Sequence, residues 1–341
     1  MSNTPIHDQH SPGPHNAHTH GSHDRHAPGS HDQQTHGSHD HSPHDHHSPH
    51  DEHSHGHAHQ GGAADDDYTD LLDLDAEVLH DYWSAALDWV RDSAADAPRA
   101  RLLDLGAGTG VGAIGLAQRY PGAEVVALDI SPTGLDRVRA KLADLGLGPR
   151  VRTVEADLDL GWPDLGWPAA GPPVLDLTWA SMSLHHMADP GQVLRDALAA
   201  TRPGGLIAVA EFSEPLRFLP DDLGFGRPGF ESRIADVLGH AHTEQMPTLG
   251  SQWAPHLTEA GWNVVAERDF PIDLDPPSHP DAARYARAWF ARLSEGLADR
   301  LEPGDRATLT ELLDENSPHS VLQRDNLHIR GVRTITLAGR D

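Results

Sequence analysis

The sequence predicts an α/β domain with a doubly wound, mostly parallel sheet of seven strands, the last of them antiparallel. Three observations support this. Apolar segments of strand length alternate with segments of helical period, a glycine-rich turn joins the first strand to a helix, and an acidic residue follows each of the next two strands. The start of the chain does not fit this pattern and forms a separate histidine-rich tail.

Residues 1–64 are expected to be a disordered tail, and residues 65–341 are expected to form the folded domain. Nineteen of the 28 histidines lie in the tail, and Ile6 is its only large aliphatic residue after Met1. A segment this poor in apolar side chains cannot offset the entropy that is lost on ordering.

The tail is densest in histidine between His41 and His59, where carboxylates such as Asp45 lie among the imidazoles. Neutral imidazoles and carboxylates suit Zn²⁺, Ni²⁺, Co²⁺ and Cu²⁺ as ligands. We therefore expect weak divalent-metal binding by the tail. We expect no metal site in the folded domain.

The composition narrows the classes of function. The chain has 25 Lys and Arg against 52 Asp and Glu, a net charge of −27, and such an acidic surface disfavours a nucleic-acid partner. The absence of cysteine excludes thiolate metal sites and cysteine nucleophiles. No run approaches the ~20 apolar residues of a membrane span. We therefore expect a cytoplasmic protein without a membrane partner.

The folded domain opens with apolar residues at helical spacing, which predicts one amphipathic helix through Leu71, Leu74, Val78, Tyr82, Ala85 and Trp89. A short strand from Leu102 to Leu105 follows, and it leads through a glycine turn into a helix. Gly106, Gly108 and Gly110 would let the backbone of this turn pass close to a ligand.

A second apolar strand ends at Asp129, where a carboxylate suits the paired hydroxyls of a ribose. The next helix is predicted to begin with Ser131 as N-cap and Pro132 at its first position, and to end at Gly146. The third strand is predicted within residues 150–159 and ends on Asp157.

This order of features resembles the class I (Rossmann-like) S-adenosylmethionine-dependent methyltransferase family. The shared features are the segment from Asp104 to Gly110, which reads DLGAGTG, and the acids after the second and third strands. Residues 176–190 are similar to the family's fourth motif, and residues 197–212 to its helix, Pro-Gly-Gly turn and fifth strand. The resemblance extends over about residues 68–340, because two later segments look like strands six and seven.

The resemblance implies that S-adenosyl-L-methionine is the cofactor. Its methionine part would lie over Gly106, Ala107 and Gly108, while Asp104 would steer the turn and reach the cofactor's amino group. The remaining cofactor contacts that the resemblance implies are Asp129 with the ribose hydroxyls, Ile130 and Leu158 with the adenine ring, Asp157 with the adenine amino group, and Ser181 beside the sulfonium.

The acceptor is expected to be a small organic molecule that is methylated on oxygen, nitrogen or carbon. A hydroxyl or a protonated amine would need a general base at the C-terminal edge of the sheet. His185 and His186 follow the fourth predicted strand and Glu211 ends the fifth, so these three are the candidate catalytic residues. The acceptor pocket should come from segments outside the common core: the leading helix with Tyr68, Tyr82 and Trp83, residues 213–247 with Phe218, Phe225 and Phe230, and residues 280–315. The three phenylalanines could equally pack in the core, because the sequence pattern would be the same.

Two other functions fit parts of the sequence. Gly108-Thr-Gly110-Val-Gly-Ala113 also fits the G-x-G-x-x-A pattern of an NAD(P)-dependent oxidoreductase, although that pattern requires neither Asp104 nor Asp157. The histidine tail could instead be the functional part, as a metal buffer beside a non-catalytic cofactor-binding fold.

Overall fold

The computed structural model describes residues 63–94, 99–167, 174–245, 248–275 and 279–341. The predicted tail lies outside these residues except for Ala63 and Ala64. These two residues begin the first helix, which therefore starts slightly before the predicted boundary of the folded domain.

Seven strands of the described chain form one sheet in the order β3-β2-β1-β4-β5-β7-β6. The strands are β1 (Arg101–Leu105), β2 (Glu124–Asp129), β3 (Val151–Glu155), β4 (Leu175–Ser181), β5 (Thr201–Arg217), β6 (Asn263–Leu274) and β7 (Ile329–Gly339). Strands β1 to β5 pair in parallel, and β7 pairs antiparallel with both β5 and β6. The predicted fold class is confirmed.

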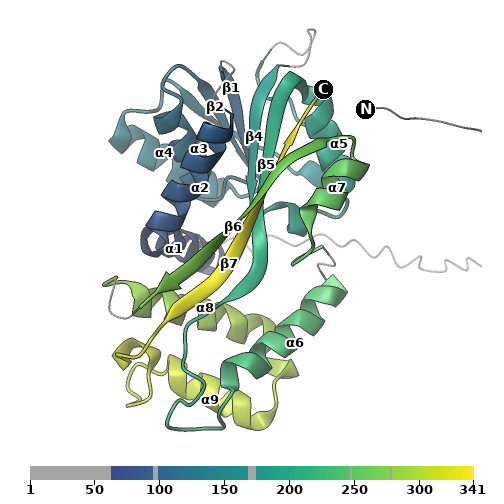
Figure 1. Ribbon diagram of the computed structural model, residues 1–341. Helices are drawn as coiled ribbons and strands as arrows, with labels where there is room; N and C mark the ends of the chain where they lie inside the picture. Colours follow the sequence, from purple (N-terminus) through teal and green to yellow (C-terminus); the bar gives the residue numbers. More distant parts are fainter. Residues whose placement is uncertain (1–62, 95–98, 168–173, 246–247, 276–278) are drawn as a thin grey trace, which may run out of the picture. The chain divides into compact units, whose positions relative to one another are not determined.

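Helices cover both faces of the sheet, with α2, α3 and α4 on one face and α5 and α7 on the other (Figure 1). The α-helices are α1 (Ala63–Val78), α2 (His80–Ser93), α3 (Val111–Arg119), α4 (Pro132–Leu145), α5 (Pro190–Ala200), α6 (Phe230–Gln245), α7 (Trp253–Glu259), α8 (Ala282–Leu297) and α9 (Pro303–Leu313). Side chains alternate between the two faces: Leu102 packs in the core under α3, while Leu103 packs in the core under α5.

Local signals placed the ends of α4 correctly. The Ser131 hydroxyl accepts a hydrogen bond from the Gly134 backbone N–H at 3.1 Å, and Pro132 occupies the first turn. Gly146 ends the helix with a φ of 68°, a conformation that glycine adopts without strain.

The leading helix is broken, contrary to the prediction of one continuous helix. Leu79 separates α1 from α2, and after this break the buried residues include Ala86 and Val90, whereas Ala85 is exposed and Trp89 is only half-buried. The apolar face of α2 is therefore shifted by one position from the predicted face.

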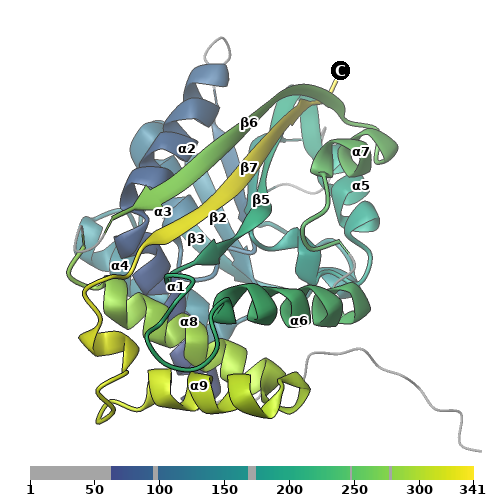
Figure 2. The same ribbon diagram turned by 60° about the horizontal axis from the view of Figure 1, so that its bottom comes forward.

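Strand β5 continues past its predicted end at Phe212 because β7 pairs with it as far as the Arg217–Arg330 partners. Beyond it, α6, α8 and α9 gather near α1, beyond the C-terminal ends of the parallel strands (Figure 2). Phe218 and Phe230 are fully buried there and pack against Phe290. They belong to the core, which is one of the two roles that the sequence leaves open for these phenylalanines.

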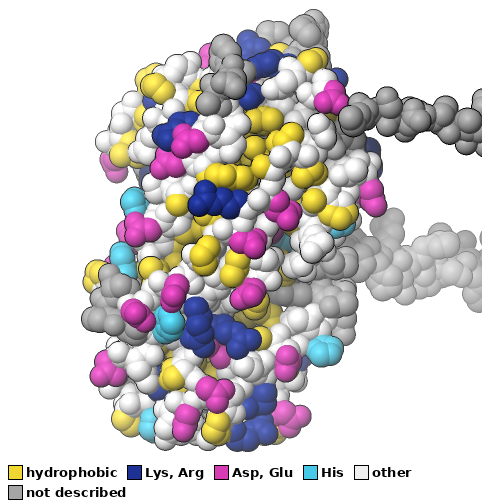
Figure 3. All heavy atoms as spheres, viewed as in Figure 1, with side chains coloured by type: hydrophobic (Ala, Val, Ile, Leu, Met, Phe, Trp, Pro, Cys, Tyr) yellow, Lys and Arg dark blue, Asp and Glu magenta, His cyan; other side chains and the backbone are white. Residues whose placement is uncertain are grey.

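One face of the molecule, over β5, β7 and β6, shows Lys and Arg in small separate groups with Asp and Glu between them (Figure 3). No broad basic area is visible on this face. Within the described chain, no helix has both the length and the apolar character needed to cross a bilayer.

Candidate active site

The glycine turn after β1 is held from three sides. The backbone N–H groups of Gly106 and Ala107 both donate to the Leu128 carbonyl at 2.9 Å, which fixes the turn to the end of β2. Gly106 has a φ of 70°, and a Cβ built there would lie 2.3 Å from the Ser183 Cβ. A Cβ on Gly108 would lie 2.9 Å from the Leu72 methyl group of α1. The conformation and the close packing both require glycine.

Asp104 lies beneath this turn and is only 2% exposed. Its Oδ2 accepts a hydrogen bond from the Ala113 backbone N–H at 2.6 Å, and so ties β1 to the first turn of α3. Burial raises the pKa of Asp104 to about 7, and the charge of Asp129 adds to this effect, while the hydrogen bond from Ala113 opposes it.

This raised pKa gives a test. Because the folded protein holds the Asp104 proton more tightly than the unfolded chain does, the stabilisation from this group is present at low pH and is lost as pH rises from about 4 to about 7. Asp104→Asn keeps an oxygen that can accept from Ala113 but cannot ionise. We expect the variant to gain stability over the wild type by a few kcal/mol between pH 5 and pH 8, at up to about 1.4 kcal/mol per pH unit. Urea unfolding of both proteins without cofactor measures this difference. Free energies of unfolding that change with pH in parallel in the wild type and the variant would contradict the expectation.

Asp129 ends β2 and organises the turn around it. Its Oδ2 accepts from the Gly108 N–H at 2.7 Å and its Oδ1 accepts from the Ser131 N–H at 2.8 Å. The next residue, Ile130, is apolar but 41% exposed. An exposed apolar side chain beside a carboxylate at a sheet edge fits a ligand with an apolar ring and hydroxyl groups.

Asp157 lies two residues past the end of β3, not at the strand end as predicted. Its Oδ1 caps a 3₁₀ turn, Leu158–Leu160, by accepting from the Asp159 N–H at 2.9 Å. The Ala156 N–H donates to the Asp129 carbonyl at 3.0 Å, which holds this segment beside the end of β2. Leu158 is largely buried. The predicted adenosine-side residues therefore come together at one edge of the sheet.

Helix α1 covers this edge, and the sequence interpretation missed the charges that hold it. Arg137 of α4 pairs with both Asp70 and Asp73, at 2.7 and 3.0 Å. Lys141 pairs with Asp73 at 2.5 Å and also donates to the Thr109 carbonyl of the glycine turn. The sequence carries a signal for this contact, because α1 has acidic residues and α4 has two cations four residues apart. The apolar spacing of the leading helix does not reveal it.

The far end of α1 is anchored by a buried ion pair between Asp75 and Arg333 of β7. Asp75 also accepts hydrogen bonds from the Trp83 indole N–H at 3.0 Å and from the Tyr285 hydroxyl at 2.6 Å. The Arg333 guanidinium is 2% exposed and lies 4.7 Å from the Tyr82 ring centre. This network joins α1, α2, α8 and β7 into one wall.

The structure separates the three base candidates. His185 Nδ1 lies 2.7 Å from Glu211 Oε2, and the two residues are 5% and 2% exposed. His186 is exposed and packs on His185, with ring centres 4.1 Å apart. The 3₁₀ turn Leu184–His186 and strand β5 thus bring His185 and Glu211 together as a buried pair and leave His186 outside it.

Between this pair and the glycine turn lies Ser181, the last residue of β4. Its hydroxyl is buried and has no hydrogen-bond partner among the described residues. Buried polar groups are nearly always paired, so an unpaired one at the C-terminal edge of a parallel sheet fits a ligand-contacting position.

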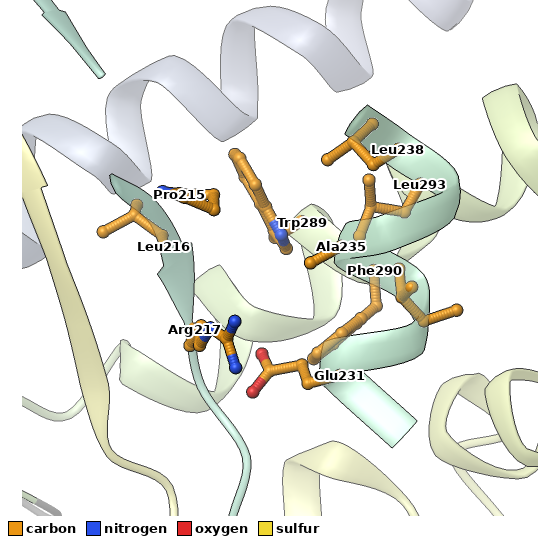
Figure 4. A pocket seen from close by; sticks show the side chains of 10 residues that line it. Pro215, Leu216, Arg217, Glu231, Ala235, Leu238, Trp289, Phe290 and Leu293 are labelled. Carbon is orange, nitrogen blue, oxygen red and sulfur yellow. The ribbon is translucent and has the colours of Figure 1, made fainter. Parts of the chain in front are cut away.

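Two hollows lie near the end of β5. A cavity of about 20 Å³ between β5, α6 and α8 is mostly apolar, with Arg217 and Glu231 pointing toward one another at its side (Figure 4). This cavity has room for about one water molecule. A wider hollow of about 710 Å³ lies along β5, β6 and β7, and its lining includes Glu214, Arg217 and Arg330. Within the described residues, no group of three or more His, Asp or Glu side chains could hold a metal ion.

Residues 103–207 match a family model described as "Methyltransferase domain". A 27-O-demethylrifamycin SV methyltransferase from Amycolatopsis mediterranei is 29% identical over 248 residues, which cover 69% of this chain and 80% of that protein. Residues 103–207 thus form a methyltransferase domain, and both findings support the predicted class I S-adenosylmethionine-dependent methyltransferase family. A demethylmenaquinone methyltransferase from Thermus thermophilus is 36% identical over 39% of this chain and 58% of its own length.

Among solved structures, a putative methyltransferase from Bacillus halodurans aligns with a TM-score of 0.47 at 17% identity, over 75% of this chain and 99% of that one. The methyltransferase spans about a third to three fifths of the length of other curated relatives, such as a malonyl-[acyl-carrier protein] O-methyltransferase from Halorhodospira halophila, of which it covers 35%. These matches are to methyltransferases and support that class over the alternative of an NAD(P)-dependent oxidoreductase.

Proposed function

We propose that this methyltransferase transfers a methyl group from S-adenosylmethionine to a hydroxyl oxygen of a small organic molecule. The observation that carries the proposal is the buried hydrogen bond between His185 and Glu211 at the C-terminal edge of the sheet. Relatives whose names state an O-methylated small molecule or carrier, such as 27-O-demethylrifamycin and malonyl-[acyl-carrier protein], agree with this acceptor class.

The residues at the sheet edge fit the cofactor chemically. Asp129 and Asp157 offer carboxylate oxygens to hydroxyl and amino donors, and exposed Ile130 offers an apolar surface to a ring. Asp104, Gly106, Ala107, Gly108, Leu158 and Ser181 would complete the cofactor site. When bound, S-adenosylmethionine supplies an electrophilic methyl group on a sulfonium.

His185 and Glu211 would remove the acceptor's proton. Glu211 accepts from His185 Nδ1–H, which fixes the imidazole tautomer and leaves Nε2 as the basic nitrogen. The acceptor hydroxyl would give its proton to Nε2 as its oxygen takes the methyl group that bound S-adenosylmethionine would supply. Burial keeps water away from the reacting atoms.

Labelled methyl transfer tests the proposal. The protein is incubated with methyl-labelled S-adenosylmethionine and a metabolite extract from cells that carry its gene, and the labelled product is identified by mass spectrometry. A product labelled on oxygen is expected. A product labelled on nitrogen or carbon would contradict the hydroxyl assignment, and calorimetry that showed tighter binding of NAD than of S-adenosylhomocysteine would contradict the cofactor.

A second proposal concerns the tail, where the spacing of imidazoles from His41 to His59 lets many sets of ligands surround one ion. We expect several weak, similar Zn²⁺ or Ni²⁺ sites that are lost on acidification, because protons compete for imidazole near pH 6.5. Equilibrium dialysis at pH 7.5 and 5.5 measures this. A variant lacking residues 1–62 should bind no metal, with unchanged melting temperature and cofactor affinity. One tight site that survives the deletion would contradict the proposal.

A further inference from the structure

Twelve buried side-chain polar atoms in the described chain have no hydrogen-bond partner, and several of them lie in one region. Five of them are at or next to the C-terminal edge of the sheet: the Tyr82 hydroxyl, Thr109 Oγ1, Ser181 Oγ, Glu211 Oε1 and Arg333 Nε. Such atoms destabilise a folded protein unless something pairs with them. Their concentration beside the His185–Glu211 pair marks this region as one that contacts a polar ligand.

Tyr82 is one of three members of this group, with Thr109 and Arg333, that the proposed reaction does not use. It lies in the first turn of α2, is 7% exposed, and has no hydrogen-bond partner for its hydroxyl among the described residues. Its ring is fixed by edge contacts with Trp83 and Phe270, at centre distances of 5.5 and 6.1 Å, and by the Arg333 guanidinium. The ring is therefore rigid, while its hydroxyl is unpaired.

The surroundings of Tyr82 place its ring on the side of the sheet away from the expected cofactor residues. Its neighbours Arg333 and Phe270 come from β7 and β6, whereas the expected cofactor residues follow β1, β2 and β3. Burial raises the pKa of Tyr82 to about 12, and the positive charge of Arg333 opposes this effect. The hydroxyl thus stays protonated at neutral pH. Arg333 is the β7 partner of Phe212, the residue after Glu211, so the Tyr82 ring that contacts Arg333 lies on the same side of the sheet edge as the proposed base pair.

We propose that the Tyr82 hydroxyl donates a hydrogen bond to the acceptor oxygen and stabilises the negative charge that develops there as His185 takes the proton. The inference rests on the proposed O-methylation. It makes α2, a helix outside the strand motifs, part of the acceptor site, and it identifies the acceptor as a molecule whose reacting group is an oxygen that can accept this hydrogen bond. A donor aimed at developing oxyanion charge contributes strongly because it acts where water is excluded.

Tyr82→Phe removes only the hydroxyl and keeps the ring against Trp83, Phe270 and Arg333. Tyr120→Phe is the matched control. The Tyr120 hydroxyl is also buried and has no hydrogen-bond partner among the described residues, and burial also raises its pKa. Tyr120 follows the C-terminal end of α3, at the other edge of the sheet, where its backbone N–H donates to the Leu116 carbonyl. Both variants lose an unpaired buried hydroxyl, so both should keep or raise the melting temperature.

The test compares methyl transfer from S-adenosylmethionine to the acceptor that the labelled extract identifies. We expect Tyr82→Phe to lower kcat/KM by about 10- to 100-fold, with a fall in kcat. The affinity for S-adenosylhomocysteine, measured by calorimetry, should stay unchanged, and Tyr120→Phe should match the wild type in all three measurements.

The outcomes separate this inference from the function on which it rests. Wild-type activity in Tyr82→Phe, together with loss of activity in a His185 variant, would overturn the role of Tyr82 and leave O-methylation standing. A fall in cofactor affinity that accounts for the whole loss would also overturn it, because Tyr82 would then act on the cofactor side. Absence of any O-methylated product with the wild type would overturn both proposals.

Discussion

His185→Asn is expected to lower kcat for methyl transfer by about 10²- to 10⁴-fold, the range for loss of a positioned general base. The asparagine amide can still donate to Glu211 in place of Nδ1, so the buried carboxylate keeps its partner, whereas a residue without a donor would leave it unpaired. Asparagine has no counterpart of Nε2 and cannot take the acceptor's proton.

His186→Asn is the matched control, because it makes the same change in the neighbouring residue. His186 is exposed and packs against His185, and the buried hydrogen bond of Glu211 goes to His185. We expect the control to retain most of the wild-type kcat. Steady-state kinetics on the labelled acceptor compares the two variants, and equal losses would show that the buried pair is not the base.

Asp129→Ala is expected to weaken S-adenosylhomocysteine binding by about 1–3 kcal/mol, the range for hydrogen bonds to a charged group. The substitution also removes the acceptor for the Gly108 and Ser131 N–H groups, so the loss contains a contribution from the turn. Calorimetry with S-adenosylhomocysteine and with its 2′-deoxyribose analogue separates the contribution of the ribose contact from that of the turn. The two proteins and the two ligands form a double-mutant cycle in which the ligand change takes the place of the second mutation.

If Asp129 binds the ribose, the analogue should bind more weakly than S-adenosylhomocysteine to the wild type, and the two should bind alike to the variant. Asp314→Ala is the control, because Asp314 also caps a turn through its carboxylate but lies at the end of α9. An affinity for S-adenosylhomocysteine that is unchanged in a folded Asp129→Ala protein would show that the ribose is held elsewhere.

The parts of the fold that depend on neighbouring residues were predictable. The ends of α4 follow from Ser131, Pro132 and Gly146, and the strand ends at Leu105 and Asp129 follow from the change between apolar residues and glycine or acid. These signals act over a few residues, and the tertiary contacts of these segments are compatible with them.

The parts that depend on distant residues were not predictable from the sequence. Glu211 pairs with His185 and not with His186, a choice that depends on how a 3₁₀ turn meets a strand 26 residues further along the chain. The Asp75–Arg333 pair joins residues 258 positions apart, and the length of β5 is set by its partner β7. Local sequence patterns identified the candidate residues, but tertiary packing determined which of these residues contact one another.

The two ends of α1 should respond differently to dissolved salt. Asp73 and its partners Arg137 and Lys141 have about 30% of their side chains exposed, so mobile ions can screen that cluster. The Asp75–Arg333 pair is almost fully shielded from solvent and is screened much less. Higher ionic strength therefore weakens the contact of α1 with α4 and the glycine turn, while the attachment of α1 to β7 persists. Under these conditions α1 would rotate about the break at Leu79 and the start of α2.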